Sequence, residues 1–154
     1  MDIFLKDEPV LIKFAHEFAN YIKRGDLITL AGEVGTGKST FARALIRYLA
    51  QDKQLEVPSP TFTLVHYYDL PPFPLAHADL YRLLDPYEID ELGFDALRAE
   101  GVLLVEWPQK AEGVLDEATF SLWFEEEDEG RRLKIDASSK AKSRLIKLVQ
   151  RLAE

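Results

Sequence analysis

The stretch GEVGTGKST, residues 32–40, decides how the rest of the chain is interpreted. Four of its residues fit the pattern G-x-x-x-x-G-K-[ST]: Gly32, Gly37, Lys38 and Ser39. Glycines let backbone N–H groups converge on a phosphate without Cβ clashes, and a following helix adds partial positive charge at its N-terminus. An apolar run, LITLA at 27–31, precedes the loop, and a helical pattern over 38–50 follows it. The sequence therefore predicts a phosphate-binding loop between a strand and a helix.

The composition is that of an ordinary folded domain. The chain has 154 residues, of which 47% are apolar and 30% are charged, and such values are typical of globular proteins. It contains no cysteine, which excludes disulfides, thiolate nucleophiles and cysteine metal sites. No apolar run approaches the length of a membrane span, and the first residues lack the pattern of a secretion signal. We therefore expect a single domain over residues 1–154, located in the cytoplasm and independent of membranes.

The charge is distributed unevenly along the chain. The formal net charge is −8, yet residues 131–154 hold eight Lys or Arg residues against two acidic ones. A basic tail of this kind can contact RNA, or it can be the solvated face of a helix. The second interpretation is favoured, because phosphate contacts dominate RNA affinity and the rest of the chain is strongly acidic.

Strand and helix patterns alternate around the glycine-rich loop. The other expected strands are one at 2–5, hairpin strands at 61–70 and 75–83, a buried strand at 101–108, and a hairpin of 118–126 with 131–137. The other expected helices are one between Asp7 and Gly25, two short helices broken at Gly93, and a last helix after Ser138 or Ser139. In the last helix, the residues expected to face inward are Leu145, Leu148, Val149 and Leu152. This order predicts an α/β domain of the P-loop NTPase type. Its sheet is mostly parallel at the centre, with antiparallel hairpin additions and flanking helices.

A nucleotide site with Mg²⁺ needs more than the loop. Glu106 ends an apolar strand, where open parallel sheets place their ligands, and Asp79 lies within an apolar strand, where a carboxylate is costly unless it faces a cation or a donor. Each can instead be a solvated strand end or a capping carboxylate. The hydroxyl of Thr61 can serve Mg²⁺ or the γ-phosphate, or it can satisfy the neighbouring backbone. Trp107 is interpreted as a core anchor and His77 as a packing residue.

Four blocks occur in a distinctive order: GEVGTGKST, SPTFTLV, HADLYRL and VEWP. Together they resemble the TsaE (YjeE) family, over about half of the chain, from Gly32 to Pro108. The members are bacterial P-loop ATPases needed to make threonylcarbamoyladenosine at position 37 of tRNAs that read codons beginning with A. The resemblance, and not the composition, suggests a role in tRNA modification.

The resemblance implies a role for each matched residue, with ATP and Mg²⁺ as cofactors. The residues implied to bind ATP are Gly35, Thr36, Gly37, Lys38, Ser39 and Thr40, with Arg131 near the base. Ser39 and Glu106 are the implied Mg²⁺ ligands. The implied catalytic residues are Asp79, which acts near the γ-phosphate and orders the water, Lys38, which contacts the phosphates, and Thr61, which behaves as a switch residue. Ser39 stands where many members have Thr, and the hydroxyl is retained.

The resemblance also implies partners. In the family, the proteins TsaB and TsaD transfer the threonylcarbamoyl group, and ATP turnover by TsaE supports repeated cycles. We therefore expect this chain to hydrolyse ATP slowly by itself, to depend on TsaB and TsaD, and to contact tRNA only indirectly through that complex.

Other nucleotide-binding classes fit the sequence less well. A small-molecule kinase usually carries an arginine-rich lid, yet Arg82 and Arg98 are the only arginines between residues 50 and 130. A GTPase needs an N-K-x-D base reader, and Asn20 is the only asparagine. The serine-glycine signature of transport ATPases is absent. A nucleotide-gated adaptor that keeps the same pocket and hydrolyses slowly remains an alternative.

Overall fold

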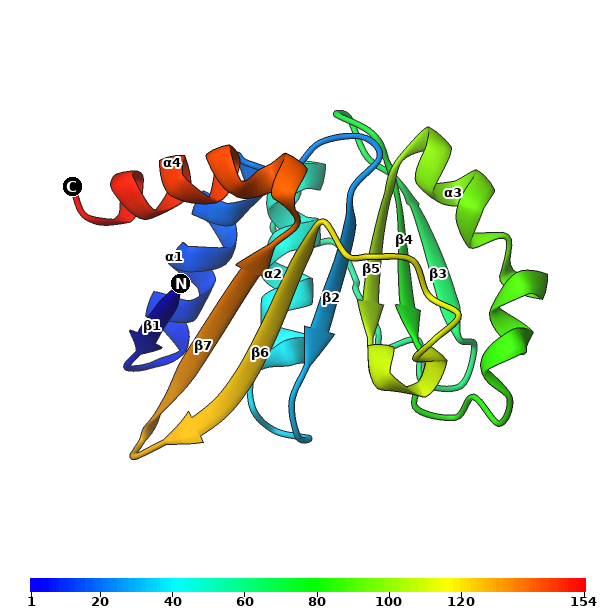
Figure 1. The fold of residues 1–154 in the computed structure, drawn as a ribbon. Coiled ribbons are helices and arrows are strands. Elements are labelled where there is room, and N and C mark those ends of the chain that lie inside the picture. The colour runs from blue at the N-terminus through cyan, green and yellow to red at the C-terminus, as the bar shows by residue number, and fades with distance from the viewer.

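A seven-stranded sheet runs through the molecule in the order β1-β7-β6-β2-β5-β4-β3 (Figure 1). The computed structural model describes residues 1–154. The strands are β1 (Asp2–Leu5), β2 (Leu27–Ala31), β3 (Val65–Asp69), β4 (Pro74–Asp79), β5 (Val102–Glu106), β6 (Phe120–Glu127) and β7 (Gly130–Ala137).

The four central strands of the sheet are parallel. β2 pairs in parallel with both β5 and β6, and β4 pairs in parallel with β5. β1, β3 and β7 are antiparallel to their neighbours. The predicted fold class is therefore confirmed: a parallel core carries two hairpins. The carboxyl ends of all four parallel strands meet at one edge, the lower edge in Figure 1.

Helices cover both faces of this sheet. They are α1 (Glu8–Ala19), α2 (Lys38–Ala50), α3 (Phe94–Glu100) and α4 (Lys142–Leu152), with 3₁₀ turns η1 (Pro86–Leu92), η2 (Pro108–Ala111) and η3 (Ser139–Ala141). α1 and α2 lie on one face, and α3 lies on the other (Figure 1). None of these helices has the length and apolarity that a membrane crossing requires.

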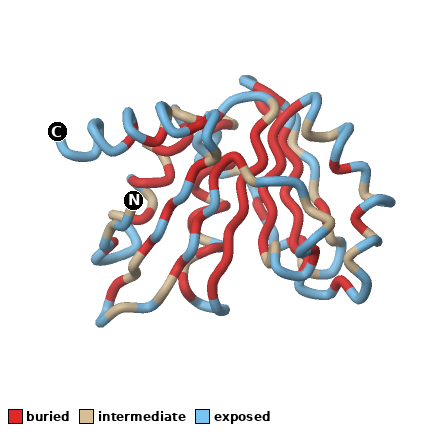
Figure 2. The backbone as a smooth tube through the Cα atoms, viewed as in Figure 1, coloured by how far each residue is buried: buried red, intermediate tan, exposed pale blue.

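Each face of the sheet has its own apolar core. The larger core packs α1 and α2 against the sheet, and four of its phenylalanines contact one another: Phe14, Phe18, Phe41 and Phe120. The smaller core lies under α3. Figure 2 shows β2 and β5 buried along their whole length. Because both faces are covered, the central strands form a rigid base for groups at their carboxyl ends.

Local signals account for several element boundaries. The Asp7 side chain accepts a hydrogen bond of 3.0 Å from the Val10 N–H and so caps α1, as the sequence predicts. Gly93 has φ 69°, a left-handed conformation that favours glycine, and it separates η1 from α3 as predicted.

Several expected segments differ from the structure. The helix expected between Asp7 and Gly25 ends at Ala19, and the strand expected at 75–83 ends at Asp79. The strand expected from residue 61 begins at Val65, because Leu64 has φ 69° and residues 61–64 form a turn. Val149 and Leu152 of α4 were expected to face inward, but they are 40% and 36% exposed. Both side chains line a groove together with residues of β1 and α1, such as Phe4 and Val10, but that groove is open to solvent (Figure 1).

Candidate nucleotide-binding site

A cavity of about 400 Å³ opens at the carboxyl edge of the parallel strands. The loop between β2 and α2 forms one wall, and the ends of β4 and β5 form the opposite wall. The lining residues are Val34, Gly35, Gly37, Lys38, Ser39, Thr40, Ser59, Thr61, Asp79, Tyr81, Glu106, Trp107 and Arg131. This list contains nearly all of the site residues that the sequence suggests.

Two glycines of the loop are required by its geometry. Gly32 has φ 133°, and a Cβ there would lie 2.4 Å from the carbonyl oxygen of Phe124. Gly37 has φ 109° and is the N-cap of α2, so the loop turns directly into the helix. The N–H groups at the start of α2 therefore face the cavity with no partner from a preceding turn. This arrangement suits an anion.

Lys38 is the buried cation of the cavity. Its side chain is buried, and its Nζ has no hydrogen-bond partner. The ammonium instead lies 3.9 Å from the centre of the Trp107 ring. Burial lowers the pKa of Lys38 below its usual value, while the carboxylates of Glu106, Asp79 and Glu33 act in the opposite direction. A buried ammonium without an acceptor is costly, and an anion in the cavity would supply the missing acceptor.

Asp79 is held by two donors at the end of β4. Its Oδ1 accepts from the Tyr81 N–H at 2.9 Å, and its Oδ2 accepts from the Thr61 hydroxyl at 3.0 Å. Because Thr61 donates its only hydroxyl proton to Asp79, Ser59 must donate to Thr61 in their 2.7 Å contact. The turn at 59–61 is thus connected to the carboxylate by side-chain hydrogen bonds.

Glu106 occupies the corresponding position on β5. Asp79 and Glu106 are paired residues in the parallel ladder of β4 and β5, and both are buried. Glu106 Oε2 lies 2.7 Å from His77 Nε2. The sequence predicts His77 as a packing residue. It is indeed buried, but its ring also bonds to a carboxylate of the cavity.

Arg131 connects the second hairpin to the loop. Its Nη2 donates to the Gly35 carbonyl at 3.0 Å, and its Nη1 donates to the Gly130 carbonyl at 3.0 Å. Gly35 is at the tip of the glycine loop between β2 and α2, 96 residues away in sequence. Arg131 is the only arginine that lines the cavity.

The residues present fit Mg²⁺ bound together with a phosphate ligand. The structure has no cluster of three or more His, Asp or Glu side chains that could hold a metal ion without another ligand. Mg²⁺ is commonly held by one or two carboxylates together with phosphate oxygens and waters. Ser39 and Glu106 line the same cavity as the unpartnered Lys38 ammonium, so this donor set suits a metal that arrives with a nucleotide.

Comparison with known proteins identifies the family of the chain. A family model described as "Threonylcarbamoyl adenosine biosynthesis protein TsaE" matches residues 5–134, which include every residue that lines the cavity. The chain belongs to the TsaE family. The resemblance that the four sequence blocks indicate is therefore confirmed.

Individual members of the TsaE family match most of the chain. A protein of Haemophilus influenzae named tRNA threonylcarbamoyladenosine biosynthesis protein TsaE is 30% identical over 149 residues, covering 93% of this chain and 93% of that protein. A protein of Rickettsia felis with the same name is 32% identical over 148 residues, covering 96% of this chain and 86% of that protein. The crystal structure of YdiB from Bacillus subtilis has the same fold, with a TM-score of 0.79 over 98% of this chain and 95% of that chain, at 24% identity.

Some residues of the TsaE site differ from the sequence-based interpretation. Thr36 does not line the cavity, because its hydroxyl turns inward and donates to the Glu33 carbonyl at 2.6 Å. Trp107 was interpreted as a core anchor. It is half-buried and packs against the smaller core, and it also forms part of the cavity wall. Its left-handed φ of 58° turns the ring out of the sheet, where it contacts Tyr81 at 5.0 Å between ring centres.

Besides Trp107, three lining residues were not predicted from the sequence: Val34, Ser59 and Tyr81. Ser59 and Tyr81 flank the predicted residues Thr61 and Asp79 at a distance of two positions in each case. The signal was present, because both belong to the blocks SPTFTLV and HADLYRL on which the family resemblance rests.

Proposed function

We propose that this chain binds ATP with Mg²⁺ in the cavity and hydrolyses it, as the ATPase component of the machinery that makes threonylcarbamoyladenosine in tRNA. Membership of the TsaE family supports the part played in tRNA modification. In this proposal ATP turnover by the chain supports repeated cycles of its partners TsaB and TsaD, and the chain does not itself modify tRNA.

One observation carries the assignment of a nucleotide. The Lys38 ammonium is buried at 5% exposure and has no hydrogen-bond acceptor. It lies next to a glycine loop that ends in the N-terminus of α2. Phosphate oxygens would accept from the ammonium and from the helix N–H groups together, which relieves the cost of the unpartnered charge.

The proposal divides the remaining groups by their position. Ser39 and Glu106 would hold Mg²⁺, which when bound neutralises charge on the phosphates. Asp79 would accept a hydrogen bond from the attacking water and keep it in line with the γ-phosphate. Thr61 already donates to Asp79, so movement of the 59–61 turn would alter the carboxylate that orients the water.

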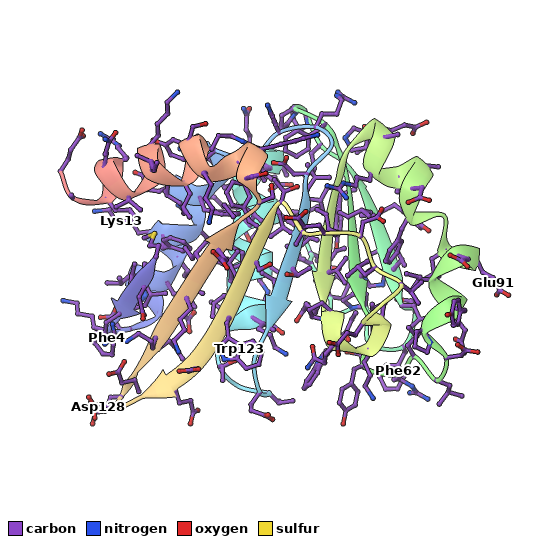
Figure 3. All side chains as sticks on the ribbon, viewed as in Figure 1. Phe4, Lys13, Phe62, Glu91, Trp123 and Asp128 are labelled. Carbon is purple, nitrogen blue, oxygen red and sulfur yellow. The ribbon has the colours of Figure 1, made fainter.

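The position of the arginines supports slow hydrolysis in isolation. Arg131 is bonded to the loop, and Arg82 lies outside the cavity lining with its guanidinium 4.8 Å from the centre of the Phe62 ring. Phe62 is 82% exposed, at the edge of the sheet where the cavity opens (Figure 3). Neither arginine is free inside the cavity. An arginine supplied by a partner protein can raise the rate of nucleotide hydrolysis by a factor of about 10³–10⁵.

Reconstitution with purified partners tests the proposal. Co-elution of the chain with TsaB and TsaD in a size-exclusion experiment is expected to depend on whether ATP, ADP or no nucleotide is present. A nucleotide-gated adaptor would show the same dependence without phosphate release. Failure to bind ATP, or nucleotide-independent behaviour in every mixture, would reject the proposed function.

A further inference from the structure

His77 is a buried ionisable group that the proposed mechanism does not use. Its side chain is 3% exposed, that of Glu106 is 4% exposed, and the Nε2–Oε2 distance is 2.7 Å. The two residues come from different strands, since His77 lies in β4 and Glu106 ends β5. A buried ring directed at a candidate Mg²⁺ ligand raises the question of what the contact does.

The strand geometry places this contact on the face that carries the nucleotide loop. Side chains two residues apart on a strand share one face of the sheet. Leu75, two residues before His77, and Leu104, two residues before Glu106, both belong to the core under α1 and α2. His77 and Glu106 therefore lie on the α2 side of the sheet, where Ser39 is in the first turn of the helix.

The chemistry of the pair settles the direction of the hydrogen bond. An ionised carboxylate can only accept, so the His77 Nε2–H must be the donor. His77 Nδ1 has no partner in the structure. Nε2 therefore makes the only hydrogen bond of the ring.

We propose that His77 is a positioning residue for Mg²⁺ at this site. By donating to Oε2 it fixes the rotamer of Glu106 and leaves Oε1 as the oxygen that serves the metal, so that the carboxylate binds through one oxygen. The inference rests on the proposed function, since it assigns a role to the residue behind the Mg²⁺ ligand. Residues that hydrogen-bond to a metal ligand and orient it typically increase the metal affinity by about 10- to 100-fold.

Two substitutions separate this role from simple packing. In His77→Gln the side-chain amide nitrogen lies the same number of bonds from Cβ as Nε2, so the donor to Glu106 is kept. His77→Leu fills a similar volume without any donor. If His77 only packs, the two substitutions should have equal effects. If His77 positions Glu106, Gln should preserve its role and Leu should not.

Calorimetric titration of ADP, in EDTA and at increasing Mg²⁺, measures the effect without any turnover. All three proteins are expected to bind ADP equally in EDTA. The quantity compared is the Mg²⁺ concentration at which half of the Mg²⁺-dependent change in ADP affinity is reached. It is expected to be the same in the wild type and in His77→Gln. In His77→Leu it is expected to rise on the order of tenfold or more. An unchanged Mg²⁺ requirement in His77→Leu, or an equal defect in His77→Gln, would overturn the inference.

Two further comparisons keep the test decisive. If circular dichroism shows that His77→Leu does not fold, His77→Asn replaces it, because its amide is one methylene too short to reach Glu106. In a Glu106→Gln background, removal of the His77 donor is expected to change the Mg²⁺ requirement no further, and an equal additional rise would overturn the inference.

If the wild type itself shows no Mg²⁺ effect on ADP binding, the proposed Mg²⁺–nucleotide site fails. A normal wild type with an unaffected His77→Leu contradicts the positioning role alone.

Discussion

Asp79 and Glu106 are paired across β4 and β5, yet each carboxylate is held by a different group. Asp79 accepts from the hydroxyl of Thr61, while Glu106 contacts the buried ring of His77. One acid is thus connected to a surface turn and the other to the interior of the sheet. This difference suggests that the two carboxylates have different tasks.

The first prediction separates these tasks. Glu106→Gln is expected to raise the Mg²⁺ concentration needed for turnover, because an amide is a weaker ligand than a carboxylate for a hard cation. Asp79→Asn is expected to depress turnover while ATP stays bound, because the group that accepts from the water is weakened. Turnover and ATP affinity across a range of Mg²⁺ concentrations measure both effects. Identical behaviour of the two variants at every concentration would count against the division.

The second prediction concerns Lys38. Lys38→Ala removes the ammonium that lacks an acceptor, and ATP affinity is expected to fall on the order of tenfold or more, since a charge-assisted hydrogen bond is worth about 1.5–3 kcal/mol. Lys110→Ala is the control, because Lys110 does not line the cavity. Wild-type ATP affinity in Lys38→Ala would be incompatible with a phosphate-binding loop at residues 32–40.

The third prediction tests the contact between Arg131 and Gly35. Arg131→Met keeps most of the aliphatic chain and removes both the charge and the 3.0 Å hydrogen bond to the Gly35 carbonyl. ADP affinity is expected to fall several-fold, because the tip of the loop loses its charged anchor. Arg132→Met is the matched control, since Arg132 instead pairs with Glu127 and Asp2. Equal ADP affinities for the two variants would show that Arg131 does not support the loop.

The fourth prediction concerns stability and not the site. Arg144 on α4 donates to both carboxylate oxygens of Asp26, at 2.7 and 3.0 Å, and to the Tyr21 carbonyl. The Asp26 side chain is 4% exposed. Arg144→Ala leaves this buried carboxylate without its cation and is expected to lower the free energy of unfolding by about 3–5 kcal/mol.

Urea unfolding measures this loss, with Lys147→Ala on the exposed face of α4 as the control, which should lie within about 0.5 kcal/mol of the wild type. A loss of less than about 1 kcal/mol in Arg144→Ala would mean that Asp26 finds another partner or water when Arg144 is absent.

The parts of the fold that follow local rules could be predicted from the sequence. The glycine loop, the capping by Asp7 and the break at Gly93 each depend on residues that are neighbours in the chain. The side of a helix that meets the sheet is a different matter. Val149 and Leu152 have the correct spacing for burial, but their exposure depends on whether another element lies opposite them.

The contacts within the site could be predicted only in part. Strand ends at Asp79 and Glu106 are visible as polar residues in apolar runs, so their proximity follows from the parallel sheet. The His77 contact with Glu106 depends on the lateral register of β4 and β5, and the Arg131 contact with Gly35 joins positions 96 residues apart. The left-handed backbone of Trp107 has no clear sequence signal, so its turn into the cavity could not be foreseen.

Phosphate release tests the central claim most directly. Steady-state ATP hydrolysis should be measured for the purified chain, alone and with TsaB and TsaD, alongside Lys38→Ala in both mixtures. The account predicts slow release by the chain alone, a changed rate when both partners are present, and little release by the variant in either case. Fast release by the chain alone that the partners leave unchanged, or release that persists in Lys38→Ala, would contradict it.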